Sequence, residues 1–206
     1  MSKTDSQITT GQGRAVYPRL TEPDYKFHPN EGLYSTKLHL EEEAYTQLEK
    51  KVEAIVERGY QAELAKQGKP KLKRASTSPL RVTDEGQFEV YAKQLAKKQT
   101  AKGELTFNVP IYDSQGKIIE EPPNIGSGSI LNLSCDVACW YVPTSGFGYT
   151  LRLKGAQLIK LVEYNGGVSA DNLGFKAVEN GFVGETFDLD EESTENKEAS
   201  TQSVPF

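Results

Sequence analysis

Large aromatic and cationic side chains recur on the polar side of several strand-like stretches of this 206-residue chain. In each stretch apolar residues occupy every second position, so the intervening side chains point away from the core. The outward set contains three rings and four cations: Tyr91, Tyr112, Trp140, Lys37, Lys93, Arg152 and Lys154. Phosphates attract cations, and unstacked bases need flat π surfaces, where stacking is worth ~1–3 kcal/mol per base. The pattern therefore indicates a surface for single-stranded nucleic acid, with the rings stacking bases and the cations holding phosphates.

A second source of positive charge is the segment 66–102, which holds ten bases and three acids. Within it, Lys71, Lys73 and Arg74 follow a predicted helix and are further candidates for phosphate contacts. Two alternatives stay open at this point. A lysine-rich loop can simply be solvated, and the outward rings can be covered by an N-terminal arm or a dimer partner.

The net charge of −5 is unevenly distributed along the chain. Residues 185–206 hold seven acids and one base, a charge of −6, so the other 184 residues sum to +1. Because this last segment has few apolar groups, we expect a domain over residues 1–184 followed by a disordered acidic tail. The candidate interaction residues of the tail are Asp188, Asp190, Glu191, Glu192 and Phe206. Such a tail can occupy a cationic groove and dock its terminal ring in a partner, or it can simply aid solubility.

Other patterns that could carry chemistry are weak. His28 and His39 are isolated, and no acidic cluster has the spacing of a metal site, so we expect neither metal nor cofactor. Cys135 and Cys139 lack an identifiable histidine base and fit small buried hydrophobes. Residues 126–129 fit a tight turn better than a phosphate cradle, since no Gly-Lys-Ser/Thr follows. The sequence thus predicts a protein that is not an enzyme, and its apolar runs are too short to cross a membrane.

The elements that position the outward side chains follow from periodicity. Residues 34–40 alternate with period two and predict a strand, whereas 41–66 repeat apolar positions at helical spacing and predict a helix that Gly68 and Pro70 end. Further strands are predicted at 87–93, 104–112, 129–142 and 146–164, with Gly155 as a bulge and 113–116 as a turn. The inward residues of 104–112 are predicted to be Leu105, Phe107, Val109 and Ile111.

Residues 1–32 are rich in Gly, Pro and Thr, so we expect an irregular arm that packs through Tyr17, Tyr25 and Phe27. The polar N-terminus lacks the apolar core of a secretory signal. About five strands with one early helix fit a small closed or nearly closed β-barrel.

A series of short motifs runs in order along nearly the whole chain. The series comprises Glu22-Pro23-Asp24-Tyr25, Gly32-Leu33-Tyr34, the long early helix, Tyr112-Asp113-Ser114-Gln115-Gly116-Lys117, Pro123-Asn124-Ile125-Gly126-Ser127-Gly128-Ser129, Leu151-Arg152-Leu153, Leu161-Val162-Glu163 before Gly166-Gly167, Val178-Glu179-Asn180-Gly181-Phe182-Val183, and an acidic tail ending in Phe206. With this series the chain resembles the single-stranded DNA-binding proteins of short-tailed bacteriophages of the T-seven type. Its tail is less acidic than the family type and ends Val204-Pro205-Phe206 in place of an acid followed by Phe.

The resemblance implies an OB-fold, a five-stranded Greek-key barrel, with one long inserted helix. It implies a protein that coats single-stranded DNA in phage DNA replication, recombination and repair, and that promotes strand annealing. It also implies a homodimer in the cytoplasm of the infected bacterial host, whose tail engages the replicative DNA polymerase and the helicase-primase. The residues leave one alternative open, a protein-interaction module or nucleic-acid mimic that binds a partner protein through the barrel and the tail.

Overall fold

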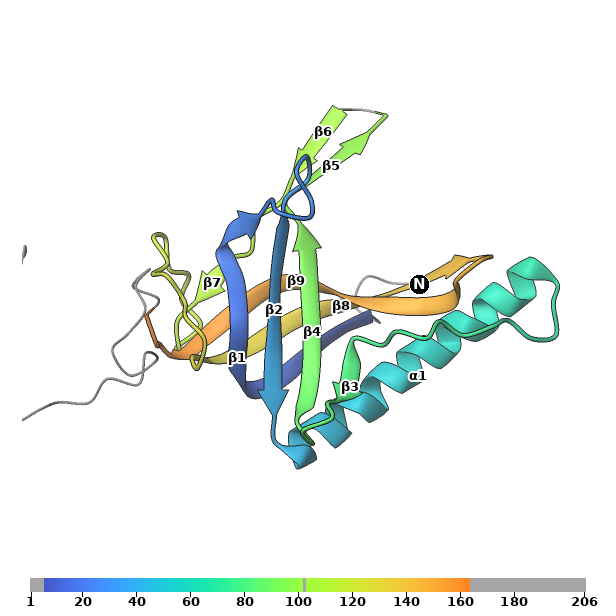
Figure 1. Cartoon of the computed structure of the whole chain (residues 1–206), viewed down its shortest axis with the longest axis horizontal. Helices are drawn as coiled ribbons and strands as arrows, with labels where there is room; N and C mark the ends of the chain where they lie inside the picture. Colours follow the sequence, from blue (N-terminus) through green and yellow to red (C-terminus); the bar gives the residue numbers. More distant parts are fainter. Residues whose placement is uncertain (1–5, 102, 164–206) are drawn as a thin grey trace, which may run out of the picture. The chain divides into compact units, whose positions relative to one another are not determined.

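The computed structural model of the chain describes residues 6–101 and 103–163. These residues form a mainly β structure with one long helix (Figure 1). In chain order the elements are β1 (Gln7–Asp24), β2 (Leu33–Leu40), α1 (Glu42–Gln67), β3 (Leu80–Val82), β4 (Phe88–Leu95), β5 (Lys97–Thr100), β6 (Gly103–Thr106), β7 (Ile111–Tyr112), β8 (Ile130–Val142) and β9 (Gly146–Lys160).

Five of the strands close into a barrel, in the order β1-β2-β4-β9-β8 and back to β1. The neighbouring strands are antiparallel except β4 and β9, which are parallel. This parallel contact closes the sheet by pairing Ala92 with Leu151 and Lys93 with Arg152. The barrel is an OB-fold, as the resemblance implies, and α1 is inserted between its second and third strands.

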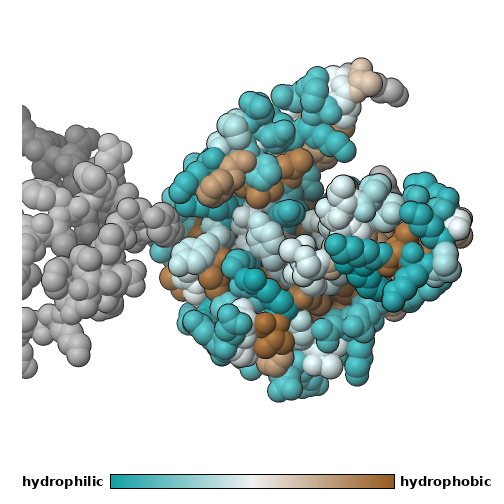
Figure 2. Space-filling view, turned by 45° about the vertical axis from the view of Figure 1, so that its right-hand side comes forward, coloured by the Kyte–Doolittle hydropathy of each residue, from teal (hydrophilic) through white to brown (hydrophobic). Residues whose placement is uncertain are grey.

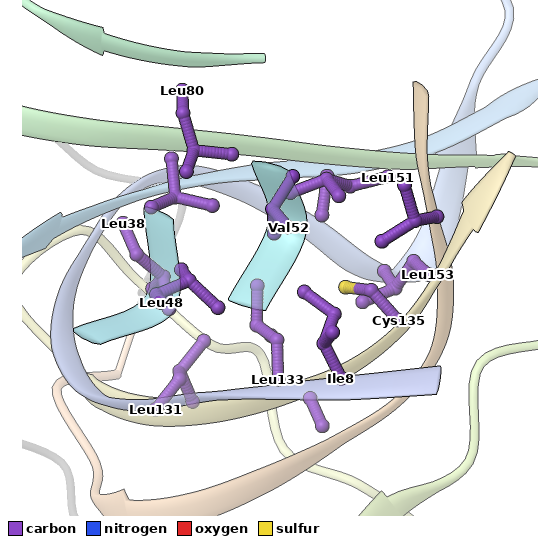
Figure 3. Close-up of a cluster of buried hydrophobic side chains, with 14 of the residues drawn as sticks. Ile8, Leu38, Leu48, Val52, Leu80, Leu131, Leu133, Cys135, Leu151 and Leu153 are labelled. Atoms are coloured by element: carbon purple, nitrogen blue, oxygen red, sulfur yellow. The ribbon is translucent and has the colours of Figure 1, made fainter. Parts of the chain in front are cut away.

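The core contains the alternate residues that strand parity predicts to point inward. Leu38, Val90, Leu131 and Leu151 are all fully buried. Helix α1 buries Tyr45, Leu48, Val52, Ile55, Val56 and Tyr60. Figure 3 shows Leu48 and Val52 among barrel side chains of the same buried cluster. The sequence-based helix is confirmed, and it ends at Gly68, which adopts the left-handed conformation with φ 61°.

The expectation of an irregular N-terminal arm was wrong, because residues 7–24 form the first barrel strand. Its inward positions include Thr10, Gly13 and Ala15, which are small or polar and so give no apolar alternation. Gly13 is needed because a Cβ there would lie 2.5 Å from Leu40 Cδ2 on β2. Two of the three aromatics expected to pack, Tyr17 and Phe27, are instead 79% and 78% exposed.

The predicted single strand at 104–112 was also wrong. Residues 103–106 pair with β5 in a hairpin separate from the barrel sheet, and only Ile111–Tyr112 join β9. Val109 and Ile111 are buried as predicted, but Leu105 is 50% exposed. Alternating apolar residues predict a half-buried strand only where a core lies beneath them, and the β5–β6 hairpin projects beyond the barrel (Figure 1).

Candidate nucleic-acid interface

A groove of about 560 Å³ lies on the outer face of the barrel, and we call it the β4–β9 groove. Strands β4, β8 and β9 contribute Lys93, Trp140, Arg152 and Lys154 to its lining, four of the seven outward residues predicted from sequence. The β5–β6 hairpin adds further lining on the opposite wall. Figure 2 shows the hollowed surface below this projecting hairpin. The fold therefore brings a large ring and three predicted cations into one concave site.

Trp140 is held by its cross-strand neighbours on β9. It lies opposite Gly148, and a Cβ at position 148 would be 2.5 Å from Trp140 Cζ2 and 2.7 Å from Cη2. The indole therefore occupies the space that any side chain at position 148 would need. Trp140 Nε1 also donates a hydrogen bond of 3.2 Å to Thr150 Oγ1. These two contacts fix the orientation of a half-buried ring that lines the groove.

The groove combines cations from different strands with one acid. Lys93 and Arg152 are register partners on β4 and β9, and neither forms an ion pair within the described ranges. Lys154 lies 3.8 Å from Asp136 through Nζ and Oδ2. Lys98 of the hairpin also lines the groove, so four cations face one carboxylate. The site therefore carries an excess of positive charge that can attract phosphates.

The β8–β9 ladder is irregular beside these cations. Ser134 pairs with Gly155 and Cys135 pairs with Leu153, which leaves Lys154 without a partner in the ladder. The bulge predicted at Gly155 is therefore confirmed. Lys154 lines both the β4–β9 groove and a second hollow of about 420 Å³. Tyr112, which is exposed on β7, lines that second hollow. This predicted stacking ring therefore shares Lys154 as a neighbouring residue with the β4–β9 groove.

Lys37 and Tyr91 lie outside the groove, paired with each other on the outer face of β2 and β4. The ammonium of Lys93 is 5.9 Å from the centre of the Tyr91 ring. Lys37 Nζ lies 3.1 Å from Glu89 Oε2, and Arg81 contacts the other carboxylate oxygen at 2.6 Å. Burial alone would raise the pKa of Glu89, but the hydrogen bonds and charges of the two cations outweigh it and hold that pKa below its usual value.

The predicted phosphate contacts Lys71, Lys73 and Arg74 lie elsewhere, between α1 and the tip of the β8–β9 hairpin. Arg74 Nη2 is 2.6 Å from Glu57 Oε2, and its guanidinium lies 4.3 Å from the centre of the Tyr60 ring. Lys73 accepts a backbone hydrogen bond of 2.7 Å from Phe147. The structure does not bring these three residues to the groove, although all three are exposed.

Sequence reasoning missed several residues that line the groove, among them His28, Lys98 and Phe107. The strand periodicity predicts that Phe107 faces the core, yet this residue directly follows β6 in the chain and lines the groove. Pro110 was a usable signal, because a proline inside a strand-like run argues against a continuous central strand. Lys97 and Lys98, which open β5 one residue after the end of β4, also mark a cationic segment that leaves the barrel.

The other candidate chemistry is limited in the part of the chain that the structure describes. The residues from Ser6 to Glu163, with Lys102 left aside, contain no group of three or more metal-ligating side chains and no helix long and apolar enough to span a membrane. Burial raises the pKa of the Cys135 thiol to about 12, which keeps it from acting as a thiolate. The tail residues Asp188, Asp190, Glu191, Glu192 and Phe206 lie outside the described residues, as does the predicted boundary at 184/185.

Comparison with known proteins identifies the architecture. No protein-family model matches the chain, and no curated protein does. The crystal structure of gp2.5, a single-stranded DNA-binding protein encoded by bacteriophage T7, matches with a TM-score of 0.68 at 24% identity, covering 87% of this chain and 98% of that one. The single-stranded DNA-binding protein of bacteriophage Enc34, solved in complex with single-stranded DNA, gives 0.54 at 14% identity over 78% of this chain and 89% of that one.

The chain has the fold of these phage proteins. The predicted OB-fold with an inserted helix is thereby confirmed by two solved structures as well as by the strand order. The individual roles assigned to Trp140, Tyr91, Tyr112 and the cations stay predictions. The geometry of the groove indicates which of these side chains a single bound strand could contact together.

Proposed function

We propose that this protein binds single-stranded DNA without catalysing a reaction, and that the strand lies in the β4–β9 groove. The observation that carries the proposal is the presence, in one concave site, of a fixed indole and of Lys93 and Arg152, two cations without ion pairs in the described chain. A protein of the same fold has been solved with single-stranded DNA, which supports the proposal.

The chemistry of the groove favours binding that depends little on base sequence. A π face stacks on any base, and lysine and arginine contact phosphates that every nucleotide carries. Trp140 would stack one base, while Tyr112, which shares the second hollow with Lys154, and Tyr91, which lies near Lys93, would stack others. Lys93, Arg152 and Lys154 would hold the intervening phosphates, with Lys37 and the exposed Lys71, Lys73 and Arg74 as more distant contacts.

The biological setting is part of the same proposal. Because the two phage proteins described above share this fold, we propose a role for this protein in phage DNA replication, recombination and repair, in the cytoplasm of an infected bacterial host. There it would coat and protect single strands, promote annealing and act as a homodimer. The acidic tail would recruit the replicative DNA polymerase and the helicase-primase through Phe206, and it would occupy the cationic groove when no strand is bound.

A gel-shift titration with single-stranded DNA, duplex DNA and RNA at low and high salt tests this function. We expect single-stranded DNA to be retained at low salt and released as salt rises. The lysines and arginines of the protein displace counterions that are condensed on the DNA, and this release of counterions becomes less favourable at high salt. A full-length variant with Asp188, Asp190, Glu191 and Glu192 changed to Asn or Gln should bind more tightly. Failure of the wild-type chain to retain single-stranded DNA at low salt would favour the alternative, a protein-interaction module or nucleic-acid mimic.

A further inference from the structure

Phe27, in the connection between β1 and β2, is a large apolar ring that is left almost entirely in solvent. Its exposed fraction is 78%, whereas Tyr25 in the same connection is 45% exposed. The ammonium of Lys26 lies 5.5 Å from the centre of the Phe27 ring. A bare aromatic face beside a cation is the same pairing of groups that Lys93 and Tyr91 present on β4.

The exposure of Phe27 is built into the conformation of this connection. Asp24 Oδ1 accepts a 2.8 Å hydrogen bond from the Lys26 backbone, and His28 O accepts another of 2.8 Å from Gly32. Tyr25 packs against Gly32, where a Cβ would come within 2.9 Å of the tyrosine ring. Gly32 itself has φ 64°, which favours glycine. The backbone is therefore held while the Phe27 ring is directed away from the core.

The same connection forms part of the groove. His28, the next residue after Phe27, lines the β4–β9 groove, as does Leu33 at the start of β2. Backbone hydrogen bonds also join the connection to the base of the β5–β6 hairpin, from Ala96 to Gly32 at 3.0 Å and from Lys97 to Glu31 at 2.8 Å. Figure 1 shows this connection beside the base of the hairpin. Phe27 therefore immediately precedes a groove residue, in a connection that is hydrogen-bonded to the base of the β5–β6 hairpin.

We propose that Phe27 is a further base-stacking platform, which receives a nucleotide of the same strand as it leaves the groove beside His28, while Lys26 contacts the adjoining phosphate. This inference rests on the proposed function, because it extends the path of the same DNA strand. It predicts that the strand crosses the barrel from the Trp140 region toward the β1–β2 connection and does not end beneath the hairpin.

Tyr17 provides a matched control for Phe27. It is 79% exposed, belongs to β1, and lines neither the β4–β9 groove nor the second hollow. We expect Phe27→Ala to weaken binding of a long deoxythymidine oligonucleotide about 5-fold or more, since stacking on a ring contributes ~1–3 kcal/mol per base. Phe27→Tyr should keep near wild-type affinity, and Tyr17→Ala should leave it unchanged.

A direct readout uses the single tryptophan of the chain. In a Trp140→Phe background, a tryptophan is introduced by Phe27→Trp or, as the control, by Tyr17→Trp. Saturating single-stranded DNA should quench the emission from position 27 and leave that from position 17 unchanged. If the wild-type protein binds DNA but position 27 is not quenched and Phe27→Ala matches Tyr17→Ala, the platform at Phe27 is refuted and the proposed function stands. If the wild-type protein does not bind, the proposed function itself fails.

Discussion

Replacing Gly148 with alanine tests how the ring of Trp140 is presented to DNA, because it disturbs the ring without removing it. The new Cβ would lie 2.5 Å from Trp140 Cζ2 and 3.0 Å from the Cβ of Ala75. Carbon atoms pack best at about 3.5–4.0 Å, so the indole has to retreat by about 1 Å or more. Because the bond from Nε1 to Thr150 Oγ1 is already 3.2 Å long, this shift breaks it.

The expected losses follow from these contacts. One hydrogen bond of this kind contributes about 1 kcal/mol, and overpacking costs about 1–3 kcal/mol, so the free energy of unfolding should fall by roughly 2–4 kcal/mol. Complete removal of the ring by Trp140→Ala should lower DNA affinity by the ~1–3 kcal/mol of one stacked base, or about 5- to 150-fold. Gly148→Ala should give an intermediate loss of about 3- to 10-fold.

A double-mutant cycle makes this reasoning refutable. Affinity is measured by the fluorescence anisotropy of a labelled oligonucleotide, and stability by urea unfolding, for Gly148→Ala, Trp140→Ala and the double variant. If Gly148 acts only by positioning the indole, its substitution should have no further effect on affinity once Trp140 is alanine. An equal loss of affinity in both backgrounds would show that position 148 acts through the fold, and the positioning role would be wrong.

Two further predictions concern charge. Lys93→Ala and Arg152→Ala should each weaken binding to every single-stranded sequence, and each should make the slope of log affinity against log salt shallower by about 0.7. Lys51→Ala, on the exposed side of α1, should change neither affinity nor slope. An unchanged slope for the Lys93 and Arg152 variants would show that these two residues are not part of the interface. Because the folded-state pKa of Glu89 lies below its usual value, its contribution to stability is present above the ordinary carboxyl range and is lost as pH falls through the folded pKa. Glu89→Gln should therefore lower the free energy of unfolding by about 1–3 kcal/mol at neutral pH, and it should make that free energy, measured with urea, depend less on pH in the acid range. Glu85→Gln is the exposed control. A free energy of unfolding that does not change with acid pH in the wild type would contradict this prediction.

The sequence could predict the elements that have one face on the core and one in water. Strands β2, β4, β8 and β9 and helix α1 all show the expected apolar period, so the outward positions of Lys93, Trp140 and Arg152 followed directly from parity. Strand β1 was not predicted because the small residues Gly13 and Ala15 face inward; at Gly13, the close approach of β2 leaves no room for a side chain.

The rest of the site depends on contacts between distant segments, which periodicity does not contain. Leu105 and Phe107 alternate as core residues do, yet their segment leaves the barrel and becomes a wall of the groove. Lys37 and Arg81 face outward as cations, but pairing with Glu89 occupies them. Arg74 is drawn to Glu57 and Tyr60 on α1, away from the groove. Outward direction could be predicted, whereas the partner that each cation finds could not.

The most direct test of the central claim is the fluorescence of Trp140, because it is the only tryptophan in the chain and it lines the groove. Titration with a deoxythymidine oligonucleotide should quench its emission in a saturable manner, and adding salt should reverse the quenching as the strand dissociates. Binding that saturates by anisotropy while the emission of Trp140 stays constant would place the DNA elsewhere on the protein and contradict the groove as its site.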